Sequence, residues 1–575
     1  MNNRLSISLC SLPLLIAAAY GCGEPSENTD GDVFVDGAGG AVGYGGGGVG
    51  VVGGAVGYGG VPVGYGGVPS GVGGAPIGNG GTPIGNGGTP IGNGGTPIGN
   101  GGTPIGNGGT PIGNGGTPIG NGGTPIGNGG TPIGNGGTPI GNGGTPIGSG
   151  GEPVGTGGAV QTTCTFNVSS ETSTEIPTVG IVTWSVDGSV NSASIDFGLD
   201  TSYGMTAPVD LAEPNYRTLL LGMKPSQTYH FRVTATTSSG NCSSEDFTIQ
   251  TGARSNTLKQ VTVSTPNPSA ASGGFLVTSE WQAGPAFIVD ADGEYVWWYN
   301  PSDHVTMADP SVTRARMSYD GKYMWIINNN NMQSGQAQIV RVTMDGLQVE
   351  SFSEIDHTHD ATITSDERLF LPEFSAMMGG GCGGIYERSP NGSVRAVVDN
   401  VGPLVGGTDC HVNSIHYFAQ DDSITFSELT QGAYVKVSSQ GQHIWTLGGP
   451  NNDFTGDGAT WSGRNHGHHV LAPDRLLIFD NGQFGQSSIA YEIQLDLNNM
   501  TATRVWQYDS GNTSNVLGDV QRLPNGNTLV SYCDSGVIHE VDANGNLLKE
   551  YGWAIGGALG YVNLRETLYG PPPKP

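Results

Sequence analysis

The chain is poor in basic residues. Its 575 residues include 21 lysines and arginines against 49 aspartates and glutamates, which gives a formal net charge of −28. Nucleic acids and anionic lipid headgroups repel so acidic a protein. We therefore expect no nucleic-acid partner, and the acidic surface is more simply a solubility feature than an indication of substrate.

Long hydrophobic runs are also missing, apart from one near the N-terminus. An apolar stretch from Leu5 to Tyr20 follows the basic Arg4 and is too short to span a bilayer comfortably. Residues 1–22 are therefore predicted to be a secretory signal peptide. Small residues before Cys22 and polar residues after it resemble a bacterial lipoprotein cleavage site, which predicts lipidation of Cys22 and attachment to the outer surface of a membrane. Plain signal-peptide cleavage and retention as an anchor are the alternatives. The expected location is the bacterial cell envelope, either periplasm or cell surface.

Cysteine is scarce, with seven in the chain, two of which lie in the signal region. An exported protein can keep disulfides. Cys164 and Cys242 bracket one predicted small domain and are expected to pair. Cys382 and Cys410 lie in neighbouring loops, where they either pair or stay free. Cys533 is then left as a buried, inert thiol.

Glycine, in contrast, is abundant: the chain has 102 glycines, most of them before Val160. Nine exact copies of Thr-Pro-Ile-Gly-Asn-Gly-Gly run from Thr82 to Gly144. One isoleucine per repeat cannot offset the conformational entropy of ordering so much glycine. Residues 23–160 are therefore predicted to be a long disordered linker that tethers a globular head. A glycine-rich repeat that self-associates is the alternative.

Short alternating strands occupy residues 161–253, which favours a small β-sandwich. Within it, Leu221-Gly-Met-Lys-Pro225 is followed by Tyr229-His-Phe-Arg-Val233. This pair of motifs resembles the fibronectin type III signature, in which the tyrosine packs at a strand corner. The resemblance implies a fibronectin type III-like domain, and spacing or scaffolding is a simpler role for it than ligand binding.

An internal repeat dominates residues 254–575 and decides the fold class. An apolar run leading to a turn with Asp-Gly, Asn-Gly or Gln-Gly, or ending at an aspartate, recurs six times, 45 to 57 residues apart. Such turns between apolar runs favour hairpins, and four-stranded units repeated radially form a propeller. We predict an all-β protein with a six-bladed β-propeller, in which residues 260–263 close the ring by joining the last blade. Five or seven blades are the alternatives, because the ends of the repeats are ragged. The runs begin at Phe287, Val340, Ile385, Tyr434, Tyr491 and Ile538.

Three histidines precede strand-like runs at the same place in successive repeats. His359, His411 and His468 are separated by 411 − 359 = 52 and 468 − 411 = 57 residues. In a propeller they would converge on the central axis. A neutral imidazole is a nucleophile and a proton shuttle near pH 7. Asn413 and nearby peptide N–H groups could bind anionic oxygens. The spacing therefore predicts an active site.

The motifs around these histidines resemble those of bacterial arylsulfotransferases (aryl-sulfate sulfotransferases). The succession is His359-Asp360, His411-Val-Asn-Ser-Ile415, Trp445-Thr-Leu-Gly-Gly449, and His468 ahead of Phe479-Asp-Asn-Gly482. The resemblance covers residues 261–568. It implies a six-bladed propeller that moves a sulfuryl group from an aryl sulfate to a phenol through a sulfohistidine. It also implies no cofactor and no nucleotide sulfate donor.

The resemblance further implies a role for each residue. His468 would be the nucleophile, with His466 and His469 beside it as the other possibilities. His411 and Asn413 would bind sulfate oxygens, and His359 would assist the phenol oxygen by proton transfer.

One position departs from the family pattern. An arginine that contacts the sulfate is usual in the strand after His-x-Asn, but here Leu429 takes its place beside Glu428. The loss of a guanidinium fork removes the strongest sulfate donor. Arg464 is the expected substitute for sulfate binding, with Arg314 and Arg316 as the others.

Two other functions fit parts of the pattern. A non-catalytic surface propeller that binds a ligand or partner is favoured by Leu429 and by the long linker. A metal-dependent hydrolase is favoured by the imidazoles and carboxylate of residues 357–360 and 466–469, which are groups that bind zinc. We predict that no metal is required.

Overall fold

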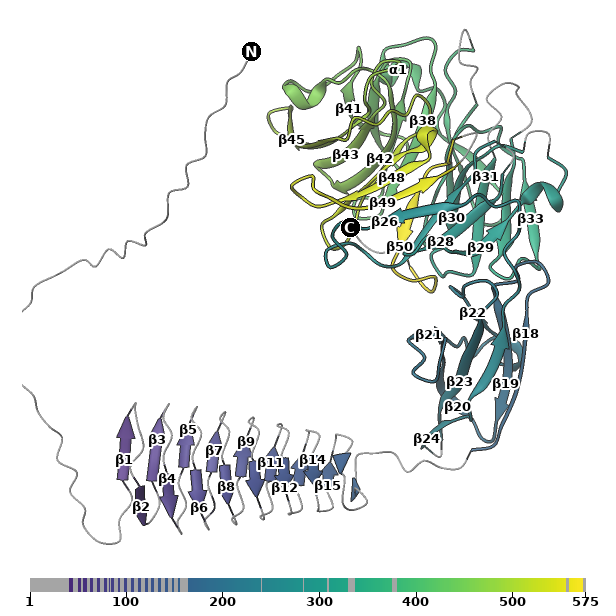
Figure 1. Ribbon diagram of the computed structural model, residues 1–575. Coiled ribbons are helices and arrows are strands. Elements are labelled where there is room, and N and C mark those ends of the chain that lie inside the picture. The colour runs from purple at the N-terminus through teal and green to yellow at the C-terminus, as the bar shows by residue number, and fades with distance from the viewer. Residues whose placement is uncertain are drawn as a thin grey trace, which may run out of the picture. The chain divides into compact units, whose positions relative to one another are not determined.

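A computed structural model describes the strands between Ala41 and Gly155, and residues 164–571 with gaps at 239, 283, 308–309, 329–336, 375–379 and 555–557. The chain divides into two compact units, Met1–Ala159 and Val160–Pro575 (Figure 1). The all-β class is confirmed, because the one α-helix of the described residues, α1 (Gly402–Val405), is four residues long. The described residues contain no helix long and apolar enough to cross a membrane. The predicted signal peptide and Cys22 lie outside them.

In the first unit, the repeat forms two parallel sheets of very short strands. Odd-numbered strands make one sheet of nine and even-numbered strands the other sheet of eight (Figure 1). Each strand pairs with its equivalent two repeats away, so that Ile84 lies opposite Ile98 and Asn86 opposite Asn100. The strands are β1 (Ala41–Tyr44), β2 (Gly50–Val52), β3 (Ala55–Tyr58), β4 (Val63–Tyr65), β5 (Ser70–Val72), β6 (Ile77–Asn79), β7 (Ile84–Asn86), β8 (Ile91–Asn93), β9 (Ile98–Asn100), β10 (Ile105–Asn107), β11 (Ile112–Asn114), β12 (Ile119–Asn121), β13 (Ile126–Asn128), β14 (Ile133–Asn135), β15 (Ile140–Asn142), β16 (Ile147–Gly148) and β17 (Val154–Gly155).

The expectation of a disordered linker is therefore wrong for these strands. The sequence argument weighed one repeat alone, and one repeat with a single isoleucine has too little apolar surface to stay ordered. Stacked repeats behave differently, because each unit supplies backbone partners to its neighbours and stability grows with their number. Ile84, Ile91 and Ile98 are accordingly half-buried.

The second unit begins with two small antiparallel sheets. Tyr229, Phe231 and Trp184 lie in their shared core. The Tyr229 hydroxyl accepts a hydrogen bond from the Lys224 amide at 2.8 Å, the contact expected at the predicted tyrosine corner. Cys164 and Cys242 form the predicted disulfide. One sheet is β18 (Phe166–Thr172), β19 (Gly180–Val186) and β22 (Thr218–Leu220), and the other is β20 (Val190–Gly198), β21 (Met205–Pro208), β23 (Thr228–Thr237), β24 (Gly240–Ser243) and β25 (Phe247–Gln250).

Six antiparallel sheets follow, and four of them are formed by strands in sequence order. These four are β30 (Val312–Met317) to β33 (Val349–Phe352) through β31 (Tyr323–Asn328) and β32 (Ile339–Thr343); β34 (Thr362–Ile363) to β37 (Val394–Val398) through β35 (Leu369–Pro372) and β36 (Ile385–Arg388); β38 (Val412–Phe418) to β41 (His443–Gly448) through β39 (Ser423–Glu428) and β40 (Ala433–Ser438); and β42 (Asn465–Ala472) to β45 (Thr501–Asp509) through β43 (Arg475–Asp480) and β44 (Ile489–Asp496).

The other two sheets join distant parts of the chain. The C-terminal strand β50 (Asn563–Arg565) completes the first sheet by pairing with β27 (Phe275–Ser279). Residues 261–264 join the last sheet, as predicted for 260–263, because β26 (Val261–Ser264) pairs with β49 (Leu547–Trp553) (Figure 1). The first sheet also contains β28 (Ala286–Asp290) and β29 (Tyr295–Tyr299), and the last contains β46 (Asp519–Arg522), β47 (Thr528–Tyr532) and β48 (Val537–Val541).

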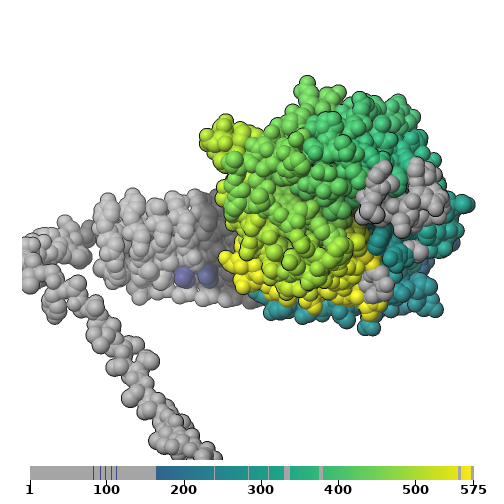
Figure 2. All heavy atoms as spheres, turned by 90° about the horizontal axis from the view of Figure 1, so that it is seen from above, coloured from purple at the N-terminus to yellow at the C-terminus, as the bar shows by residue number. Residues whose placement is uncertain are grey.

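Adjacent sheets pack face to face. Phe370 of β35 shares one apolar cluster with Phe426 of β39. Trp445 of β41 shares another with Ile478 of β43. Burial of such side chains stabilises the fold by roughly 1.5–3 kcal/mol each. Figure 2 shows the green and yellow atoms of the later sheets as a continuous surface, so side chains fill the gaps that a ribbon leaves open.

The first strands of successive sheets run in parallel and are joined by hydrogen bonds from backbone to side chain. The amide of Ile415 donates to Asp360, and the amide of Tyr417 donates to Thr362, each at 3.2 Å. Both partners advance by two residues, so the two segments run in the same direction. These bonds fix the height of one sheet relative to the next.

A buried arginine ties these strands together. Arg314 of β30 binds both oxygens of Asp360 at 2.9 and 3.0 Å, and it binds Asp519 of β46 at 2.7 Å. Its guanidinium also lies 4.3 Å from the ring centre of Tyr561. A buried charge is tolerated only when paired and hydrogen-bonded. Burial opposes the Asp360 charge, but Arg314 and Arg316 outweigh it and hold the pKa of Asp360 below its usual value.

We predict that Arg314→Met lowers the free energy of unfolding by about 3–5 kcal/mol, because two buried carboxylates lose their partner. Urea unfolding followed by fluorescence measures this loss. Lys322→Ala, which removes a solvent-exposed ion pair with Asp210, is the control and should change stability by less than about 1 kcal/mol. An Arg314→Met protein as stable as the control would contradict the central role of this arginine.

Candidate active site

Three of the first strands have a β-bulge near their start. The register shifts at Thr313 in β30, at Asn413 in β38 and between Asn465 and His468 in β42. A bulge re-aims a side chain and is common next to functional sites. In β42 the bulge depends on Gly467, since a Cβ there would lie 2.2 Å from the Asp519 carboxylate.

Imidazoles from three sheets meet at this end of the strands. His359 Nε2 lies 3.4 Å from His411 Nε2, with the rings edge to face. The centre of the His466 ring lies 6.2 Å from that of His359. All three side chains are buried. His359, which precedes β34, His411, which precedes β38, and His466, within β42, are called the histidine trio below.

Hydrogen bonds fix which nitrogen of His466 carries the proton. The Asn481 amide nitrogen donates to the carbonyls of Ser514 and Leu517, each at 2.7 Å. The Asn481 side-chain oxygen therefore faces His466 Nδ1, 2.6 Å away, and accepts from it. Because Nδ1 holds the proton, the lone pair of a neutral His466 is on Nε2. The spacing of residues 479–482 does not reveal this orienting role of Asn481.

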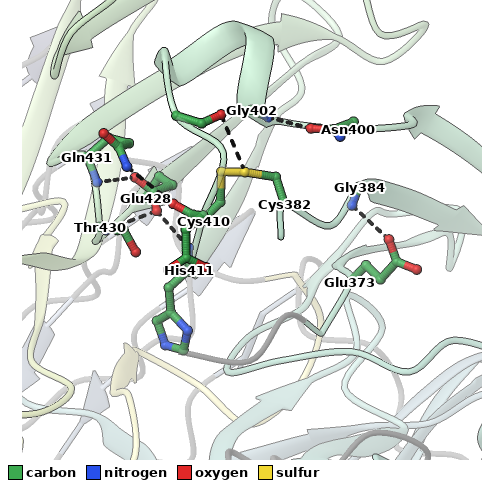
Figure 3. Close-up of a disulfide and its surroundings, with 12 residues drawn as sticks. Glu373, Cys382, Gly384, Asn400, Gly402, Cys410, His411, Glu428, Thr430 and Gln431 are labelled. Carbon is green, nitrogen blue, oxygen red and sulfur yellow. Dashed lines mark hydrogen bonds between the residues drawn. A yellow bond between two sulfur atoms is a disulfide. The ribbon is translucent and has the colours of Figure 1, made fainter. Parts of the chain in front are cut away.

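His411 is held by the loop before β38 and by the end of β39. The Glu428 carboxylate accepts from the amides of His411, Thr430 and Gln431 at 2.6 to 2.9 Å (Figure 3). Burial raises the pKa of Glu428 although these amides oppose the shift. Cys410, the residue before His411, forms a disulfide with Cys382, so the open choice for this pair is settled as a bond. Cys533 is free and buried.

His359 sits on strained backbone. Its φ is +45°, a left-handed conformation that costs a non-glycine residue of order 1–3 kcal/mol. Its Nδ1 is 2.5 Å from the Thr358 hydroxyl. The next residue is Asp360, which Arg314 holds. The ion pair between Arg314 and Asp360 therefore fixes the position of the backbone at His359.

Burial keeps His359 and His466 neutral. It lowers the pKa of His359 well below its ordinary value, and the neighbouring His411 and His466 lower it further. It lowers the pKa of His466 to about 3, against the smaller opposing effect of the Asn481 hydrogen bond. Neutral imidazoles can attack an electrophile or accept a proton.

The structure does not bring His468 together with His359 and His411. His468 Nδ1 is hydrogen-bonded to Ser414 at 2.7 Å and Nε2 to Thr425 at 2.8 Å, between two sheets. The β42 bulge is the physical reason, because the extra residue turns His466 rather than His468 toward the other two. A strict two-residue alternation cannot anticipate that change.

Two predicted binding positions lie beside the trio. Asn413 donates to the Asn465 carbonyl at 2.7 Å, and its own side-chain oxygen is buried with no partner among the described residues. Leu429, in the place of the usual arginine, donates its backbone amide to the His411 carbonyl at 2.9 Å. The position is thus close to the trio, but it provides no cation.

Arg464 is a positively charged residue directly before β42, two positions ahead of His466. It donates to the Asn515 carbonyl at 2.8 Å and stacks 4.0 Å from the ring centre of the exposed Phe484. Its Nη1 is buried without a partner among the described residues. Burial lowers the pKa of Arg464, and its charge contributes to the low pKa of His466. Arg314 and Arg316 point instead to Asp360.

The described residues contain no group of three or more histidines, cysteines, aspartates or glutamates arranged to hold a metal ion. A cavity of about 460 Å³ lies elsewhere and is lined by Trp325, Arg341, Phe352 and Arg388, among others. Its arginines are already paired with glutamates. The histidine trio, and not the cavity, is therefore the candidate site.

Residues 403–554 match the family model described as Arylsulfotransferase (ASST). The sequence resemblance to arylsulfotransferases is confirmed over this segment. The arylsulfotransferase segment runs from α1 to β49 and includes His411, Asn413, Arg464 and His466. His359 precedes it.

Other comparisons add little. No curated protein matches the chain. A streptogramin B lyase structure is 14% identical with a TM-score of 0.34 and covers 53% of this chain and 98% of its own. Virginiamycin B lyase from Staphylococcus aureus is 13% identical with a TM-score of 0.31, covering 52% and 90%. A chain of a nidogen/laminin complex is 10% identical with a TM-score of 0.35, covering 50% and 97%. These likenesses are too slight to support a statement about activity.

Stability should fall as pH falls below the ordinary histidine pKa of about 6.5. The unfolded chain takes up protons there, whereas folded His466 stays neutral down to about 3. Between about pH 7.5 and about pH 5.5, His466→Asn should lose about 1.4 kcal/mol less unfolding free energy than the wild type. Urea titrations at both pH values measure the difference. His443→Gln, which changes an exposed histidine, should follow the wild type. Equal losses in all three proteins would contradict a neutral, buried His466.

Proposed function

We propose that the six sheets are the blades of one propeller, and that the chain transfers a sulfuryl group from an aryl sulfate to a phenol. The match of residues 403–554 to the arylsulfotransferase family supports this class of reaction. The observation that carries it is the proton-free Nε2 of His466, fixed by Asn481, on a ring whose centre lies 6.2 Å from that of His359. The proposal replaces His468 with His466 as the nucleophile.

In the first half-reaction, the lone pair of His466 Nε2 forms a bond to the sulfur of the aryl sulfate. The bond from sulfur to the aryl oxygen breaks, and its electron pair leaves with the phenolate. The sulfohistidine ring becomes positive, with its proton on Nδ1. Asn481 accepts a stronger hydrogen bond from that charged N–H and so stabilises the intermediate.

In the second half-reaction, a phenol takes the sulfuryl group. The phenol proton passes to neutral His359 as its oxygen bonds to sulfur, and the N–S electron pair returns to His466. The low pKa of His359 keeps it unprotonated at neutral pH. His411 lies 3.4 Å from His359 and can share this proton. No step needs a cofactor.

Arg464 is proposed as the cation that receives the sulfate ester in place of the arginine absent at Leu429. Its Nη1 is buried without a partner among the described residues, and an unpaired guanidinium N–H gains most from an anion. The exposed Phe484 ring lies over the same guanidinium and offers an aromatic surface to the aryl group.

A non-catalytic binding protein remains the second candidate. Two observations favour it: the histidine trio is almost entirely buried, and Leu429 removes a sulfate donor. Turnover is the property that separates the two candidates.

Export and a lipid anchor at Cys22 are part of the proposal, as is the fibronectin type III-like character of residues 161–253. Two disulfides support an oxidising location. The Tyr229 contact with Lys224 supports the fibronectin type III-like character of residues 161–253. Labelled palmitate that is incorporated by the wild type and not by Cys22→Ala is the test of the anchor.

Steady-state transfer from p-nitrophenyl sulfate to phenol tests the activity. His466→Ala should lose at least roughly 10³-fold in kcat, because it removes the nucleophile. His359→Ala should lose about 10²–10⁴-fold. His468→Gln, normalised to folded protein, should keep activity within about tenfold of the wild type.

Two results would contradict the proposal. No transfer by the wild type across a broad set of aryl sulfates would reject the function. A His466→Ala protein that transfers as fast as the wild type, while His468→Gln does not, would reject His466 as the nucleophile.

A further inference from the structure

A second cluster of donors lies toward the other end of the same strands. Arg316 is near the end of β30, His416 near the end of β38 and His469 in the second half of β42. The trio lies at or before the starts of these strands, and the strands run in parallel. The two clusters are therefore separated along the strands, with the Arg314–Asp360 pair between them.

The cluster is compact. The rings of His416 and His469 are 5.3 Å apart and edge to face. The charge of Arg316 contributes to the low pKa of both histidines, although burial is the main cause. All three side chains are partly exposed, whereas the trio is buried. Solvent therefore reaches part of this cluster.

Its donors lack matching acceptors. Arg316 Nε is buried with no partner among the described residues, as is His416 Nδ1. His469 Nδ1 accepts from the Arg522 amide at 3.0 Å, so the proton of neutral His469 is on Nε2 and remains to be donated. Arg316 Nε and the Nε2–H of His469 are thus the donors of this cluster that an added acceptor could use.

The nearest carboxylate is already occupied. Asp360 accepts two bonds from Arg314 and one each from the amides of Ala361 and Ile415. Its contact with Arg316 Nη2 is long, at 3.5 Å. Arg314 makes the short contacts with this carboxylate, and Arg316 makes only a long one.

We propose that Arg316, His416 and His469 form a second binding site, for a small tetrahedral oxyanion such as sulfate. Arg316 would supply two guanidinium N–H groups and His469 one imidazole N–H, the donors that oxyanions prefer. Free sulfate and the sulfate group of an ester share this chemistry. The site is distinct from the trio and does not depend on the proposed transfer reaction.

Calorimetric titration of His466→Ala protein with sodium sulfate tests the proposal, with sodium chloride at equal ionic strength as the reference. The His466→Ala background prevents turnover, and a parallel titration with phenyl sulfate separates the free ion from the ester. We expect sulfate-specific binding that weakens at least tenfold in both Arg316→Gln and His469→Gln. Arg368→Gln is the control. It changes an arginine that lies directly before β35 and pairs with Asp366, and it should bind sulfate as the His466→Ala protein does.

Circular dichroism identifies any variant that fails to fold, and the other variant then decides the result. Binding that is equal for sulfate and chloride would overturn the proposal. Unchanged sulfate binding in folded Arg316→Gln or His469→Gln would overturn it as well. Sulfate binding by the wild type that disappears in His466→Ala would place the anion in the trio and have the same consequence.

Discussion

The buried contact of Arg314 with Asp360 and Asp519 is the interaction on which the rest of the structure depends. It joins β30 to the segment before β34 and to β46, across the middle of the sheet assembly. A buried ion pair is weak evidence for net stability, because desolvation cancels much of the attraction. Its value here is positional: the same carboxylates also accept backbone amides of Ile415 and Val562.

Both ends of the assembly depend on this contact. At one end, Asp360 fixes the strained backbone of His359, and Asp519 fills the space that Gly467 leaves open beside His466. At the other end, Arg314 occupies Asp360 so fully that Arg316 is left with unused donors. The contacts of Arg314 therefore order a buried group of imidazoles and leave a partly exposed group with unpaired donors behind it.

Much of the larger fold could be predicted from sequence. In each repeat, the apolar runs and turn residues predict the hairpins, because both are local features of the sequence. The pairing of β26 with β49 follows from the need to close the last sheet. The strands of the first unit were not predicted. The conformational entropy of one glycine-rich repeat does not include the strand pairing between stacked repeats.

The site was predictable only in part. His359 and His411 could be placed by position within the repeat, whereas His466 could not be told from His468. The difference depends on a bulge, and the bulge depends on contact between Gly467 and Asp519, residues of different sheets. Likewise, the two carbonyls that orient Asn481 belong to residues more than thirty positions away, so no local pattern reveals its role.

The most direct measurement is the position of the covalent sulfuryl group after rapid alkaline quench with p-nitrophenyl sulfate, read by peptide mapping and mass spectrometry. The account predicts one adduct, on His466 and attached through Nε2. A stable adduct on His468, or none while product is released in a burst, would contradict it.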